Sequence, residues 1–344
     1  FNLRHDFFDS HPKWYWYLPL FLLMWGILIF VSWLVKKMPL ITGGGIPQTR
    51  GVINGRVAYK HPFIEVIAKF VGGILALSTG LSLGREGPSV QIGSYVGCLV
   101  SKWGRVLAGE RKQLLAAGAG AGLAAAFAAP LASSLLVIES IERFDAPKTA
   151  ITTLLAGVVA GGVASWLFPI NPYFQIDAIV PGMTFWSQVK LFLLLAAVVS
   201  VFGKFFSVTT LQVKHIYPAI KHPAYVKMLY LLFIAYLISL TEVNLTGGGE
   251  QFLLEQAMHA DTHIMWIVGM MILHFVFSVL SFSSGLPGGS FIPTLVTGGL
   301  IGQIVALILV RQGIIGYENI SYVMLICMSA FLVAVIRTPL TAIV

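Results

Sequence analysis

Charged residues are scarce in this chain, and their scarcity excludes an ordinary soluble domain. Only 10% of the 344 residues are Asp, Glu, Lys or Arg, whereas 57% are hydrophobic. The mean hydropathy of +0.85 is well above that of soluble globular proteins. We therefore expect an integral membrane protein that crosses the bilayer several times.

Cysteine is nearly absent as well. Cys98 and Cys327 each stand alone within an apolar segment, which excludes a disulfide framework and a cysteine-rich metal site. The H-E-x-x-H and G-x-S-x-G patterns of common hydrolases do not occur. We expect no metal, no cofactor and no enzymatic activity, and no cleavable signal peptide is visible.

Acidic residues are fewer than basic ones, and the formal net charge is +8. The basic residues concentrate between the apolar segments, around 102–112 and 204–227, rather than on one face. This pattern indicates orientation in a bilayer, with these two loops in the cytoplasm, and not nucleic-acid binding. The loops at 168–188 and 242–261, which contain acidic residues and almost no basic ones, should face outward.

Apolar stretches of full or partial spanning length recur along the chain. Together with shorter, glycine-broken pieces they predict about ten helical segments in a single transmembrane domain, 1–344, that continues beyond both ends of the sequence. The long stretches are 14–35, 114–138, 149–168, 189–202, 228–240, 264–282, 291–310 and 322–344.

Three landmarks occur twice, in the same order, at offsets of 204 to 209 positions. TGGG recurs at 42–45 and 246–249, GREGP at 84–88 is matched by GGSFIP at 288–293, and APLA at 129–132 is matched by TPLT at 338–341. We infer duplicated halves, roughly 14–170 and 186–344, as in many transporters. The charge pattern favours an inverted repeat, and a parallel repeat stays open.

Three glycine-rich turns end in proline where a helix can begin: GGGIP, GREGP and GGSFIP. Glycine permits a sharp turn, and proline suits the first helical turn. Because a helix N-terminus presents free N–H groups and a partial positive charge, converging N-termini can hold a small anion without trapping it. The alternative is that these glycines serve only close helix packing.

These motifs resemble those of the CLC family of chloride channels and chloride/proton antiporters. GGGIP resembles the family's GSGIP, GREGP matches its G(K/R)EGP, and GGSFIP fits its GxFxP; 122–139 and 282–293 are also similar. The resemblance implies an all-α membrane fold, an inverted-repeat bundle of tilted and broken helices. It also implies a homodimer in membrane lipid, such as a bacterial inner membrane, with one chloride pathway per subunit.

The same resemblance assigns roles to individual residues. Glu86 would be the gate and proton acceptor, since an ionisable group in an apolar zone is a functional candidate. Backbone groups of Ser290 and Phe291 would line the central anion site. The remaining anion-binding candidates are Gly44, Gly45, Ile46, Arg85, Gly87 and Ile292.

Two positions depart from the family pattern. Gly44 stands where the family usually has serine, which predicts weaker and less selective chloride binding. Ser140 stands at the inner proton-relay position, where proton-coupled members carry glutamate, and the family's central tyrosine would follow Val344. We therefore predict chloride transport with weak or absent proton coupling; the alternative is a chloride/proton antiporter on the same scaffold.

Other polar residues receive structural interpretations. Glu65 and Lys69, and likewise Glu139 and Arg143, have the i, i+4 spacing of helical ion pairs; an anion-attracting role for Lys69 stays open. His274 is expected to be a hydrogen-bonded packing residue. A rival hypothesis, an intramembrane hydrolase, would use His274 with a serine of the SFSSG stretch at 281–285.

Overall fold

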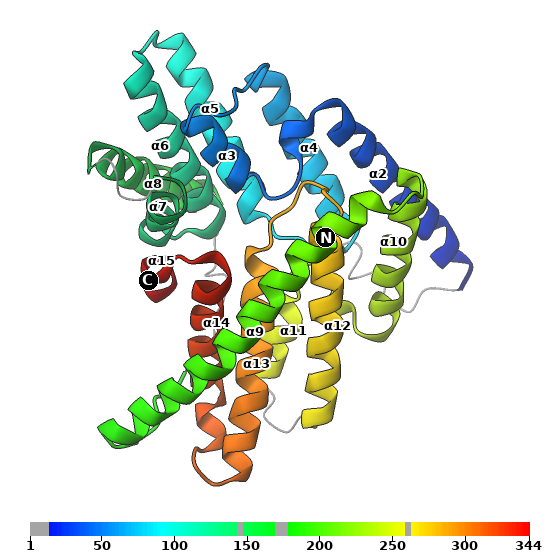
Figure 1. Cartoon of the computed structure of the whole chain (residues 1–344), viewed down its shortest axis with the longest axis vertical. Coiled ribbons are helices and arrows are strands. Elements are labelled where there is room, and N and C mark those ends of the chain that lie inside the picture. Colours follow the sequence, from blue (N-terminus) through cyan, green and yellow to red (C-terminus); the bar gives the residue numbers. More distant parts are fainter. Residues whose placement is uncertain (1–13, 143–146, 169–177, 259–262) are drawn as a thin grey trace.

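The computed structural model describes residues 14–142, 147–168, 178–258 and 263–344. Within these ranges the chain is almost entirely helical, and the one β-type pairing is an isolated bridge between Gly84 and Gly289. This agrees with the expected all-α class. The α-helices, labelled in Figure 1, are α2 (Tyr17–Lys37), α3 (Ile46–Ile53), α4 (Pro62–Ser78), α5 (Glu86–Trp103), α6 (Ala108–Phe127), α7 (Pro130–Val137), α8 (Pro147–Leu167), α9 (Phe185–Ala219), α10 (Ala224–Thr241), α11 (Glu250–Met258), α12 (Ile264–Ser283), α13 (Phe291–Arg311), α14 (Ile320–Ile336) and α15 (Pro339–Ile343).

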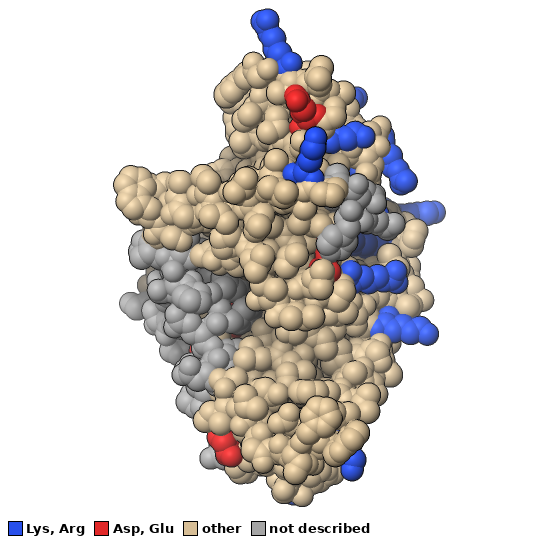
Figure 2. Space-filling view, turned by 90° about the vertical axis from the view of Figure 1, so that its left-hand side faces the viewer, with Lys and Arg blue, Asp and Glu red and all other residues tan. Residues whose placement is uncertain are grey.

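Seven segments are long and apolar enough to cross a membrane, and they differ in how deeply they are buried. In α13, 83% of the apolar window lies inside the protein, against 17% in α2 and in α8. The outer helices expose large apolar side chains such as Leu22, Leu155 and Val201, which suits contact with lipid. On the face shown in Figure 2, Lys and Arg side chains gather along one edge and most of the surface is uncharged.

Two predicted segments are each broken into two helices. The stretch 114–138 divides at Ala128 (φ +53°) before Pro130, and the stretch 322–344 divides at Arg337 (φ +65°) before Pro339. Proline lacks the N–H that would continue the helix, and it disfavours helical backbone in the residue before it. The two breaks occupy matching places in the two halves.

The predicted segment 189–202 is too short, because the corresponding helix α9 runs over 35 residues. Lys204 and Lys214, which the sequence analysis assigned to a cytoplasmic loop, lie on this helix. Lysine has a high helix propensity, and no proline occurs in α9 before Pro218. A positive charge was therefore a poor marker of the helix end.

The elements follow the same order in both halves. The series α2, a short 3₁₀ helix (Pro39–Ile41), then α3 to α7 is repeated as α10, a 3₁₀ helix (Val243–Leu245), then α11 to α15. In Figure 1, α5 and α13 extend from the middle of the molecule toward opposite ends, as the inverted-repeat bundle requires. The boundaries of the halves, 14–170 and 186–344, stay a prediction.

Helices α5 and α6 cross at very short range because glycines face each other. A Cβ placed on Gly93 would lie 2.0 Å from the Gly118 carbonyl oxygen, and a Cβ on Gly118 would lie 2.2 Å from the Gly93 oxygen. Both contacts are with backbone, which cannot rotate away. This contact, typical of small residues between membrane helices, fixes α5 and hence the position of its N-terminus.

We expect Gly93→Ala to lower the free energy of unfolding by roughly 1 to 3 kcal/mol, the usual cost of overpacking. Thermal unfolding in detergent measures this. Gly162→Ala is the matched control, because nothing lies within 4 Å of the Cβ position at Gly162. Equal melting temperatures for the two variants would contradict the proposed role of the α5–α6 contact.

Candidate functional site

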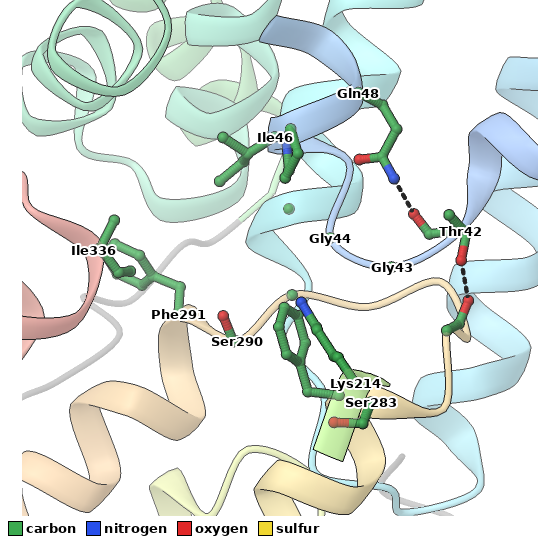
Figure 3. Close-up of a pocket in the computed structure, with 15 residues that line it drawn as sticks. Thr42, Gly43, Gly44, Ile46, Gln48, Lys214, Ser283, Ser290, Phe291 and Ile336 are labelled. Carbon is green, nitrogen blue, oxygen red and sulfur yellow. Dashed lines mark hydrogen bonds between the residues drawn. The ribbon is translucent and has the colours of Figure 1, made fainter. Parts of the chain in front are cut away.

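The N-termini of α3, α5 and α13 meet at one cavity of about 420 Å³. The first turn of each helix contributes to the lining through Ile46, Gly87 and Phe291, as Figure 3 shows for the two labelled residues Ile46 and Phe291. These helix starts lie far apart in the sequence and belong to both halves. Their partial positive charges are therefore directed toward a shared space.

Backbone hydrogen bonds between the two halves hold the turns that precede these helices. Gly84 and Gly289 exchange two N–H···O bonds, of 2.7 and 2.6 Å. The N–H of Gly43 donates to the Gly285 carbonyl (3.2 Å), and the N–H of Gly288 donates to the Gly43 carbonyl (3.1 Å). The motifs recognised in the sequence thus bond to one another across the repeat.

Glycine is required at Gly87 and Gly45 for different reasons. A Cβ on Gly87 would lie 2.2 Å from the Gly44 carbonyl oxygen, so only glycine lets α5 approach the first motif this closely. Gly45 has φ +86°, in the left-handed region, and the space beside its Cα is filled by Gln91. Glycine at Gly87 therefore lets backbone form part of the cavity wall, and glycine at Gly45 forms the turn that leads into α3.

Five of the eight anion-binding candidates line the cavity: Gly44, Ile46, Gly87, Ser290 and Phe291. The remaining candidates Gly45, Arg85 and Ile292 lie outside the lining. Gly45 faces Gln91, Arg85 is exposed, and Ile292 is 2% exposed, with its side chain 2.5 Å from where a Cβ on Gly248 would lie.

Glu86 lies beside this cavity and is completely buried. Its carboxylate is enclosed by glycines: a Cβ on Gly84 would lie 2.0 Å from Oε2, and a Cβ on Gly289 would lie 2.9 Å from it. Among the described residues, neither carboxylate oxygen has a hydrogen-bond partner of normal geometry. A buried carboxylate without such a partner is costly, which makes Glu86 a candidate for a functional role.

Ser140, at the predicted inner proton-relay position, and its neighbour Glu139 lie in a π-helical turn (Ile138–Glu142) that follows α7. The Ser140 hydroxyl donates to the carbonyl of Leu136, in the last turn of α7. The Glu139 carboxylate accepts the N–H groups of Leu340 and Thr341, both at 2.9 Å, and the Thr341 hydroxyl at 2.6 Å. These contacts make Glu139 an N-terminal cap of α15. The predicted pair with Arg143 falls outside the described residues and stays a prediction.

The predicted Glu65–Lys69 ion pair is wrong. Lys69 is fully buried, and its Nζ donates to the carbonyl of Gly43 (2.6 Å), in the first glycine motif, and to that of Ile41 (2.8 Å), directly before the motif. Glu65 lies in the first turn of α4, and its Oε1 accepts the N–H of His61 at 3.3 Å. The Glu65 carboxylate binds a free N–H donor at the start of α4, because such donors attract negative charge. The Lys69 ammonium group binds backbone carbonyl oxygens, so the two side chains have backbone partners instead of each other.

His274 is a buried packing residue, as expected. Its Nε2 lies 3.3 Å from Ser278 Oγ and 3.4 Å from the Pro293 carbonyl oxygen, and the side chain is fully buried. The serine beside it is not in the SFSSG stretch. The arrangement therefore gives no support to the hydrolase hypothesis.

Part of the cavity lining was not predicted from the sequence. Lys214 and Phe282 reach it from α9 and α12, and Ile336 reaches it from α14, while the polar Thr42, Gln48 and Ser283 complete it. A single lysine within an apolar helix was the available signal for Lys214. Thr42, Phe282 and Ser283 lie in stretches that the motifs marked, whereas the approach of Ile336 depends on helix packing that no local pattern encodes.

Comparison with known proteins matches residues 27–344 to the family model described as voltage gated chloride channel. The H(+)/Cl(−) exchange transporter ClcA of Klebsiella pneumoniae (strain 342) is 31% identical over 346 residues, covering 96% of this chain and 71% of that protein. ClcA of Salmonella arizonae is 32% identical over 342 residues, covering 95% and 70%.

Solved structures agree with this. The structure of a slow cyanobacterial Cl−/H+ antiporter superposes with a TM-score of 0.86 at 27% identity, covering 98% of this chain and 80% of the other. A CLC-type fluoride/proton antiporter shares the fold, with a TM-score of 0.78 at 21% identity, covering 99% and 82%. The expectation that the protein is not an enzyme accords with relatives named as transporters. With its seven spanning-length segments and a family match over nearly its whole length, this chain is a multi-pass integral membrane protein and belongs to the voltage gated chloride channel family.

Proposed function

We propose that this protein transports chloride through the cavity at which α3, α5 and α13 begin. The observation that carries the proposal is the convergence of three helix N-termini from both halves, with backbone groups of Gly44, Gly87 and Ser290 at the wall. Peptide dipoles replace part of the hydration of a halide without holding it as tightly as a full charge would. The names of the relatives, which are chloride exchangers, support the same substrate.

Glu86 gates this pathway in our proposal. The carboxylate is buried next to Gly87 and has no donor of normal geometry among the described residues. As an anion it requires donors, and the backbone N–H groups at the start of α5 and α13 are the nearest kind available. The ionised gate would therefore occupy the anion's place, and protonation would release it.

Proton coupling is weak or absent in this proposal because no free carboxylate stands at the inner relay position. Ser140 cannot exchange a proton at physiological pH, and its hydroxyl is bonded to Leu136. Glu139 cannot easily substitute, because its carboxylate already accepts three hydrogen bonds from α15.

Chloride/proton exchange is the second candidate. It is favoured by the names of relatives that are 31% and 32% identical over nearly the whole chain. In either mode we propose a homodimer surrounded by lipid, with one pathway in each subunit.

The gate is tested with the purified chain in liposomes, by following chloride efflux with an electrode. Wild-type efflux is expected to rise as the pH falls, because protonation opens the path. Glu86→Gln, permanently neutral, should transport at or above the low-pH rate of the wild type and lose its pH dependence. The surface variant Glu318→Gln is the matched control; unchanged pH dependence in Glu86→Gln would refute the gate.

Transport mode is tested by imposing a chloride gradient and measuring proton movement. We expect little proton uptake by the wild type and more by Ser140→Glu, since a carboxylate at that position can carry a proton. Ser140→Gln controls for size and polarity and should gain nothing. Protons driven against their own gradient by the wild type, at a rate comparable to chloride, would establish the exchange mode instead.

The weak-binding prediction for Gly44 is tested by adding the missing hydroxyl. A Cβ at Gly44 meets only ordinary contacts, 3.5 Å to the Gly289 Cα and 3.6 Å to the Gly288 oxygen, so serine fits. A hydroxyl–chloride hydrogen bond of about 1.5 kcal/mol should tighten chloride binding roughly 10-fold in titration calorimetry. Gly44→Ala controls for the added carbon, and equal affinities in the two variants would contradict the prediction.

A further inference from the structure

Lys214 is the one titratable side chain among the fifteen residues that line the cavity. It comes from α9, a helix whose other contacts are with the α12 and α14 side of the bundle. In Figure 3 its side chain reaches past Ser283 toward the loop that precedes Ser290. The residue remains partly open to solvent, so its charge stands at the edge of the cavity rather than at its centre.

An aromatic ring, not a carboxylate, holds the ammonium group in this place. Lys214 Nζ lies 3.9 Å from the centroid of the Phe282 ring, within the range of a cation–π contact. No hydrogen bond or ion pair joins Lys214 to another described residue. The ring positions the group and leaves its positive charge uncompensated, so the charge is available to an anion.

A second polar group without a partner lies in the same lining. The hydroxyl oxygen of Ser283 is buried, the residue is 7% exposed, and no described residue bonds to it. Buried hydroxyl groups normally have partners, so this one has an unused donor. Gly44, on the same cavity, offers no side-chain donor at all.

We propose that Lys214 and Ser283 form an anion-capture site at the edge of the cavity. Lys214 attracts the anion by charge, and the Ser283 hydroxyl supplies a side-chain donor that Gly44 does not. The site rests on the proposed chloride transport and adds its entry step. Because Lys214 is at the edge and partly solvated, it raises the local anion concentration without binding so firmly that release becomes slow.

The two members of the site should respond differently to salt. The exposed charge of Lys214 acts through a screened field, with a Debye length of about 10 Å at 0.1 M salt and about 3 Å at 1 M. The buried hydroxyl of Ser283 acts only at contact. Removal of the charge should therefore matter most at low ionic strength, and removal of the hydroxyl should matter equally at all ionic strengths.

The experiment measures chloride efflux from liposomes over a range of chloride concentrations, at low and high concentrations of an impermeant salt. Lys214→Gln should raise the half-saturating chloride concentration roughly 3- to 10-fold at low ionic strength, with a near-normal maximal rate. High salt should shrink this difference. Lys214→Arg should behave like the wild type, and Ser283→Ala should shift half-saturation about two-fold, independent of salt.

Lys204→Gln is the matched control, because it removes the same charge from the same exposed helix outside the cavity. An unchanged half-saturation in Lys214→Gln, or an equal shift in Lys204→Gln, would overturn the capture site. Ser283→Ala, which leaves the charge intact, gives an independent result if Lys214→Gln does not fold. Absence of chloride flux in the wild type would instead refute the proposed function, so the two failures are distinct.

Discussion

Two short backbone hydrogen bonds between Gly84 and Gly289 join the halves of this protein where α5 and α13 begin. A Cβ on either residue would displace the Glu86 carboxylate from its present position. The contact therefore aligns two helix N-termini and encloses the Glu86 carboxylate between them. The cavity, its dipoles and the position of Glu86 all depend on this pairing, and the α5–α6 glycine contact stabilises it from one side.

The arrangement keeps full charges close to the cavity but outside its centre. Lys69 is buried behind the first glycine motif, where its ammonium group satisfies the carbonyls of Ile41 and Gly43 and leaves the N–H groups of that turn for other partners. Lys214 stands at the edge, over an aromatic ring. Graded positive charge of this kind attracts an anion and still allows it to leave, whereas a lysine in the centre would hold it.

Much of this could be predicted from the sequence, because helix starts are encoded locally. Glycine followed by proline specifies a turn and a first helical residue, and all three such motifs do begin helices at one cavity.

Side-chain partners were predicted less well. Lys69 has the spacing of an ion pair with Glu65, yet its ammonium group donates to the carbonyls of Ile41 and Gly43. Glu139 accepts hydrogen bonds from Leu340 and Thr341, in the other half of the chain. Lys214 was misplaced because a basic residue also marks loops, and only the length of α9 brings it to the cavity.

The contact between Glu139 and α15 connects the two halves of the protein next to the position where the two proposed transport modes differ. In the first half the chain leaves α7 through a single π-helical turn (Ile138–Glu142), and Glu139 in that turn caps the equivalent helix of the second half. The Glu139 carboxylate accepts the N–H groups of Leu340 and Thr341 and the Thr341 hydroxyl, so it joins the two halves at this point. In our proposal proton coupling is weak because Ser140, the residue next to this capping carboxylate, cannot exchange a proton at physiological pH and donates its hydroxyl to Leu136.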